Sequence, residues 1–187
     1  MNEWNLHLDT LSLFSDRLVA ALDILNIRTQ CESLEIDHLC IRSRTSEEAD
    51  RLSYDLDQIG SQISNLKIHG RPIKIYLLDT SIALGQWDVP CIEVPYPKPG
   101  SAYPLGWEHA EFVIPVTENT LDGVRDSVFD VFPHLNNDAI RERYGYYENP
   151  PPTDEDVIPN PTIVWNINGI GIKFHANAIK TIKEANV

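Results

Sequence analysis

The chain has 187 residues, and 42% of them are hydrophobic, which is enough to build the core of one domain or of two small modules. Fifteen Lys and Arg residues against 28 Asp and Glu residues give a net charge of -13, which repels nucleic-acid phosphates and anionic lipid headgroups. The N-terminal residues have no secretory pattern, and no apolar run reaches the roughly 18 residues of a transmembrane helix. Three cysteines without a CxxC spacing predict reduced thiols. We therefore expect a soluble cytoplasmic protein without nucleic-acid or membrane partners.

The first half of the chain is predicted to be a helical segment followed by a mixed α and β module. Apolar residues between positions 6 and 25 recur mostly three or four apart, which is typical of an amphipathic helix or helix pair. The predicted elements after it are a strand at 35–42, a helix at 43–60, two strands around a turn within 67–78, and a strand at 88–94. Thr45 is the predicted N-cap of the helix, and Gly60 is its predicted stop.

A proline-rich segment at 95–100 separates this module from a second one with the same order of elements. The second module is predicted to contain a strand at 108–113, a helix at 117–132, a long irregular region, and strands at 162–166 and 170–174. Tyr144 to Pro161 is rich in proline and is predicted to be a loop that either borders a cavity and orders when a ligand binds or is a surface loop with no role. The expected domains are a helical segment at 1–35, modules at 36–98 and 105–187, and a linker at 99–104.

Two histidines occupy equivalent places, because His38 and His109 each lie near the start of the first strand of a module. The closing strand of each module offers another metal-binding side chain, Glu93 in the first and His175 in the second. Three imidazoles and one carboxylate suit Zn, Ni, Fe(II) or Mn. Glu93 stands among apolar neighbours, where a carboxylate needs a cation or hydrogen bonds. His175 is either a ligand or a cap of the next helix.

Three further residues are candidates for the chemistry of this site. Glu111 is expected on the same strand face as His109 and is either a general base or the partner of Arg42 or Lys173 in a salt bridge. Trp107 shares that face and is a candidate for substrate binding. Arg71 either holds a substrate carboxylate or is a solvated charge beside a turn.

Four short segments carry a resemblance to a known family: Ile36-Asp37-His38, Ile92-Glu93-Val94-Pro95, Gly106-Trp107-Glu108-His109 and Ile172-Lys173-Phe174-His175. With them the chain resembles the bacterial YecM family, a branch of the vicinal oxygen chelate superfamily. The resemblance covers about residue 35 to the C-terminus and implies an α+β fold of paired βαβββ modules around one cavity, with an additional N-terminal helical segment. It also implies that His38, Glu93, His109 and His175 are metal ligands. In glyoxalase I, a member of the superfamily, the last position is a glutamate, which argues against direct transfer of that activity.

Three functions remain open from the sequence. The leading hypothesis is a divalent-metal protein that acts as an enzyme of the isomerase, lyase or oxygenase class on a small oxygen-rich organic substrate. The second is a metal-free module that sequesters a small molecule, as bleomycin-resistance proteins do. The third is an interaction protein that docks a partner through the N-terminal helical segment.

Overall fold

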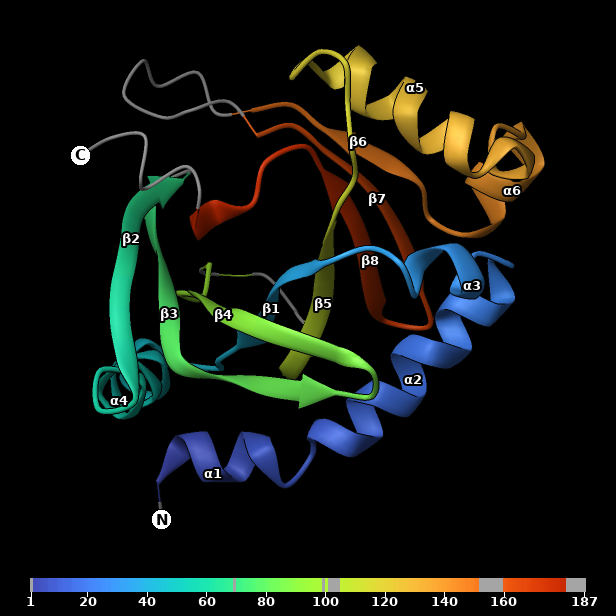
Figure 1. Ribbon diagram of the computed structural model, residues 1–187. Helices are drawn as coiled ribbons and strands as arrows, with labels where there is room; N and C mark the ends of the chain where they lie inside the picture. Colours follow the sequence, from blue (N-terminus) through green and yellow to red (C-terminus); the bar gives the residue numbers. More distant parts are fainter. Residues whose placement is uncertain (1, 69, 99, 101–104, 152–159, 181–187) are drawn as a thin grey trace. The chain divides into compact units, whose positions relative to one another are not determined.

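The computed structural model describes residues 2–68, 70–98, 100, 105–151 and 160–180 (Figure 1). The first elements are helices α1 (Glu3–Leu8), α2 (Leu11–Ile24) and α3 (Arg28–Cys31), so the N-terminal segment is helical as predicted. The first module follows as β1 (Ile36–Arg42), α4 (Ser46–Leu56), β2 (Gly60–Ile68), β3 (Arg71–Leu84) and β4 (Trp87–Pro95). Within the described ranges, no helix combines the length and the hydropathy needed to cross a membrane.

The second module repeats this order of strand, helix and three strands, with two additional short helices after the first helix. It contains β5 (Gly106–Val113), α5 (Leu121–Val131), the 3-10 helix η1 (Pro133–Leu135), α6 (Asp138–Arg143), β6 (Tyr147–Asn149), β7 (Thr162–Ile167) and β8 (Ile170–His175). Both modules therefore read βαβββ, which confirms the predicted α+β class. The prediction of a long irregular region after the helix at 117–132 is partly wrong, because the described residues there form η1, α6 and the strand β6. Residues 152–159 of the predicted loop lie outside the described residues.

The chain divides into two compact units, Met1–Arg17 with His38–His109 and Leu18–Asp37 with Ala110–Val187. In the first unit the strand order is β2-β3-β4-β1-β5, with β1 parallel to β4 and the β2-β3-β4 strands antiparallel. In the second unit the order is β5-β8-β7-β6, and β6, β7 and β8 are antiparallel. Each of β1 and β5 thus contributes residues to both units.

Helix α4 covers one face of the strands in the first unit. Its N-cap is Thr45, whose side chain accepts a hydrogen bond from the Glu48 backbone N–H at 3.2 Å, as the sequence predicts. The helix packs against β3 and β4, and α1 packs against α4 in turn (Figure 1). Ala49, Leu52 and Leu56 form its buried stripe.

Gly60 was expected to end this helix, and that expectation is wrong. Helix α4 ends at Leu56, and Gly60 is the first residue of β2, where it pairs with Leu78. A Cβ atom at position 60 would lie 2.4 Å from the backbone oxygen of Leu77. The glycine is therefore required by a close approach of two strands rather than by a left-handed helix end.

The core of the second unit is aromatic. Trp165 is fully buried, and its ring centroid lies 5.0 Å from that of Tyr146 and 6.1 Å from that of Phe174. Phe129 contacts the same cluster from α5, which packs against β7 and β8. These large rings bury the apolar faces of α5, β7 and β8 together.

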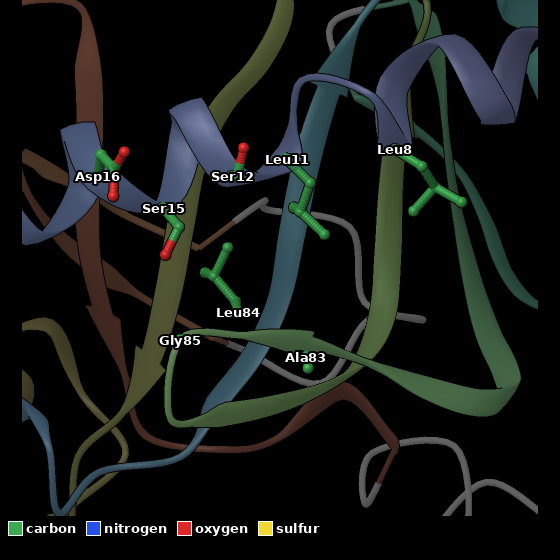
Figure 2. Close-up of a pocket in the computed structure, with 8 residues that line it drawn as sticks. All are labelled: Leu8, Leu11, Ser12, Ser15, Asp16, Ala83, Leu84 and Gly85. Carbon is green, nitrogen blue, oxygen red and sulfur yellow. The ribbon is translucent and has the colours of Figure 1, made fainter.

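A groove of about 360 Å³ lies in the first unit between α1, α2 and the turn that joins β3 to β4 (Figure 2). Leu8 and Leu11 line it from the helices, Ala83 and Leu84 line it from the end of β3, and Gly85 lines it from the turn. Ser12, Ser15 and Asp16 provide its polar lining. None of the predicted metal ligands lines this groove.

Candidate metal site

Three of the predicted ligands come together in the first unit. His38 on β1, Glu93 on β4 and His109 on β5 each offer a donor atom within 4.8 Å of the donor atoms of the other two. The strand register explains this, because β1 and β4 are parallel neighbours in which Cys40 pairs with Glu93 and His38 pairs with Cys91. Paired residues of neighbouring strands point to the same face, so Glu93 shares the face of Cys40. His38 is two residues before Cys40 and therefore lies on that face as well, next to Glu93.

The distances within this group fit an ion better than they fit direct hydrogen bonds. Glu93 Oε2 lies 3.7 Å from His38 Nε2, and Glu93 Oε1 lies 3.9 Å from His109 Nε2. Hydrogen bonds between nitrogen and oxygen measure about 2.7–3.2 Å. Ligand atoms bound at about 2.0–2.2 Å to a tetrahedral ion lie about 3.3–3.6 Å apart. A shift of a few tenths of an ångström would therefore let both pairs share a metal.

Burial makes the group chemically distinctive. His38 and His109 are each 1% exposed, and the side chain of Glu93 is 14% exposed. The neighbour of Glu93 on β3 is Ile75, which is buried. A carboxylate and two imidazoles in such surroundings are costly unless charge and hydrogen-bonding capacity are satisfied. Two nitrogen donors and one oxygen donor are suitable for Zn, Fe(II), Ni or Mn.

A second acidic residue supports His109 from the side away from Glu93. Glu108 Oε2 lies 2.9 Å from His109 Nδ1, and Arg42 Nε donates to the same oxygen at 2.7 Å. The Cys40 thiol also donates to it, with a sulfur to oxygen distance of 3.6 Å. Burial alone would raise the pKa of Glu108, but its hydrogen bond and charge interaction with His109 and the charge of Arg42 lower that pKa to about 2. Glu108 is therefore ionised at neutral pH.

His175, the fourth predicted ligand, lies in the second unit and is fully buried. Its Nδ1 lies 2.6 Å from Asn160 Nδ2 and 3.4 Å from Glu111 Oε2, while its Nε2 lies 3.6 Å from Asp37 Oδ2. Asp37 also accepts a hydrogen bond from the backbone N–H of Ile179. The ring of His175 is thus surrounded by one amide and two carboxylates, and the two carboxylates are buried.

Glu111 belongs to the same unit and forms one of the two salt bridges that the sequence left open. Lys173 Nζ lies 2.6 Å from Glu111 Oε1, and Arg42, the other possible partner, pairs with Glu108 in the first unit. Glu111 leaves β5 two residues after His109. Its position in the strand remains compatible with the role of a base or of a residue that supports a ligand.

The two candidates for substrate binding have protein partners in the first unit. Trp107 is 5% exposed, its indole N–H donates to the His7 backbone oxygen at 2.9 Å, and its ring stacks on Phe14 with centroids 5.8 Å apart. Arg71 Nη1 donates to the backbone oxygen of Tyr96 at 3.0 Å. Through these contacts Trp107 attaches α1 and α2 to β5. Arg71 joins the start of β3 to Tyr96, the residue after β4.

Sequence reasoning missed Glu108, Arg42 and Asp37 as members of the polar groups around the histidines. A signal was present, because an acidic residue directly precedes the histidine in both opening strands, as Asp37-His38 and Glu108-His109. Alternation along an ideal strand directs adjacent side chains to opposite faces, so this pattern does not by itself place the acidic side chain beside the histidine ring. In the folded protein, Glu108 nevertheless reaches the ring of its neighbour.

Comparisons with known proteins agree with the sequence resemblance. The chain is 27% identical over 169 residues to Protein YecM of Escherichia coli strain K12, which covers 89% of this chain and 87% of that protein. It is 29% identical over 153 residues to an uncharacterised protein of Haemophilus influenzae, with 78% of this chain and 76% of that protein covered. A solved structure titled Structural Genomics, Protein EC4020 matches with a TM-score of 0.70 and 23% identity, covers 97% of this chain and 93% of that one, and so shares its fold. Residues 3–186 match the family described as YecM protein, and the chain therefore belongs to the YecM family.

Proposed function

We propose that this protein binds one divalent metal ion through His38, Glu93 and His109 and acts on a small, oxygen-rich organic substrate. The observation that carries the proposal is the convergence of two buried imidazoles on one carboxylate, with nitrogen to oxygen distances of 3.7 and 3.9 Å. Three protein donors, or four with His175, leave positions on a five- or six-coordinate ion for water or substrate, which is the pattern of catalytic rather than structural sites. Isomerase, lyase and oxygenase chemistry are all compatible with such a site.

The residues around the ligands would divide the remaining work. A bound ion would polarise neighbouring oxygens of the substrate. Glu111, two residues after His109 in β5, is the proposed base, and Lys173 holds its carboxylate in one orientation. His175 is the proposed fourth ligand, and Arg71 and Trp107 are the proposed contacts to substrate. These four assignments rest on strand position and on the family resemblance.

Metal analysis of purified protein tests the proposal. Metal-free protein is incubated separately with Zn, Ni, Mn or, under anaerobic conditions, Fe(II), and the retained metal is measured after gel filtration. We expect about one ion per chain in the wild type and little in His109→Ala. His134→Ala is the matched control, because the Nε2–H of His134 donates a hydrogen bond to the Leu25 backbone oxygen at 2.8 Å and His134 is far in sequence from the three ligands. His175→Ala shows whether a fourth ligand exists.

The alternative function gives a different result in the same experiment. A wild type that retains none of the four metals contradicts the proposal. If this metal-free protein still binds a compound from a set of dicarbonyls, catechols and hydroxy acids, then the site is a metal-free module for small molecules. Binding that appears only with metal, and is lost in His109→Ala, supports a metal-dependent substrate site.

A further inference from the structure

One oxygen of Glu108 lies at the centre of a small buried network in the first unit. Glu108 Oε2 is 2.9 Å from His109 Nδ1, 2.7 Å from Arg42 Nε and 3.6 Å from the sulfur of Cys40. The side chains of Arg42 and Glu108 are only 12% and 14% exposed. A charge-assisted bond from a rigid guanidinium fixes both the charge and the direction of the carboxylate.

This network determines which nitrogen of His109 carries hydrogen. An ionised carboxylate only accepts hydrogen bonds, so the ring atom that faces it, Nδ1, must be the donor. In a neutral imidazole the other nitrogen then has the lone pair. That other atom is Nε2, which is the one that lies 3.9 Å from Glu93 Oε1. The acidic neighbour therefore directs the basic nitrogen of His109 toward the other proposed ligands.

The same three residues invite a competing interpretation, since Cys40, Glu108 and His109 could themselves hold an ion. Arg42 argues against it. Its guanidinium already contacts the carboxylate oxygen that such an ion would need, and a second cation at that oxygen would meet strong repulsion. The arrangement corresponds instead to a carboxylate and histidine pair behind a metal ligand.

We propose that Glu108, held by Arg42, is a positioning residue that keeps neutral His109 in its Nδ1–H form and presents Nε2 to a divalent ion shared with His38 and Glu93. This inference rests on the proposed metal site. It adds two residues to that site which contact no substrate and act through His109. Loss of such a partner lowers metal affinity by about 10–100-fold in other proteins.

The tautomer is measured first, on metal-free wild-type protein labelled with ¹⁵N at histidine, by long-range ¹H–¹⁵N correlation at a pH where the ring is neutral. His109→Gln assigns the signals. The wild type should show His109 with hydrogen on Nδ1, and Glu108→Ala should shift the ring toward the Nε2–H form. Glu108→Gln should retain most of the Nδ1–H form, because its amide oxygen can still accept. Glu142→Ala, which changes an exposed glutamate on α6, should leave the signals unchanged.

Zinc affinity is then measured by competition with a chelator of known affinity. We expect Glu108→Ala to bind about 10–100-fold more weakly than the wild type, with Glu108→Gln in between. An Nε2–H form in the wild type overturns the inference even if every variant fails to fold. Equal zinc affinity and an unchanged tautomer in Glu108→Ala also overturn it. Two ions per chain, one of them lost in Cys40→Ser, would make Glu108 a ligand rather than a positioning residue.

The failures of the two proposals can be told apart. A wild type that binds no metal contradicts the proposed function, whereas the tautomer of metal-free His109 still reports on Glu108. A wild type that binds zinc through His38 and His109, with a tautomer independent of Glu108, contradicts only the inference. Circular dichroism of each variant shows whether it is folded at the temperature used.

Discussion

Replacing Glu108 by Gln should destabilise the metal-free protein in a way that depends on pH. The variant imitates the protonated carboxylic acid, because it keeps the shape of the side chain and removes its charge. The pKa of Glu108 falls from its ordinary 4.5 to about 2 in the folded protein, where burial opposes the shift and His109 and Arg42 cause it. At about 1.4 kcal/mol for each pKa unit, the ionised form contributes up to about 3 kcal/mol to folding.

The sign follows from the direction of the shift. The folded pKa lies below the unfolded one, so the contribution is fully present above about pH 4.5 and is lost as the pH falls toward 2. Urea denaturation with a chelator present, repeated from pH 7 to pH 3.5, gives the free energy of unfolding of both proteins. The difference should be largest near pH 6–7 and should shrink below pH 4.5. A constant difference, or one under about 0.5 kcal/mol throughout, would refute the reasoning. Glu142→Gln controls for loss of an exposed charge.

Two further predictions concern backbone features of the first module. Gly60→Ala should lower the free energy of unfolding by about 1–3 kcal/mol, because the new Cβ would lie 2.4 Å from the Leu77 oxygen. Ser61→Ala, at an exposed position of the same strand, should change it by less than about 0.5 kcal/mol, and equal effects of the two would contradict the steric argument. Thr45→Ala should cost about 1 kcal/mol in urea denaturation through loss of the N-cap of α4, while Thr45→Ser should cost little. No loss in Thr45→Ala would mean that the cap contributes nothing to folding.

Much of the fold could be predicted from local patterns. Thr45 and Thr120 cap α4 and α5 by accepting from the backbone N–H three residues later, an interaction that depends only on neighbours in the chain. The repeated order of strand, helix and strands is visible because apolar periodicity and turn residues are local signals. The strand β6 was missed, since three residues just before a run of prolines form a strand only because they pair with β7.

The sequence was enough to predict which residues form the candidate metal site. It was not enough to predict which side chains contact one another there. His38, Glu93 and His109 were indicated by equivalent places in a repeated unit, which is information that the chain itself contains. The parallel register of β1 and β4, which sets His38 beside Glu93, depends on hydrogen bonds between segments about 50 residues apart. The bonds from Arg42 and His109 to Glu108 depend on side-chain directions that strand alternation does not predict. Residue type determines what a side chain can bind, whereas only packing in three dimensions decides which partner it meets.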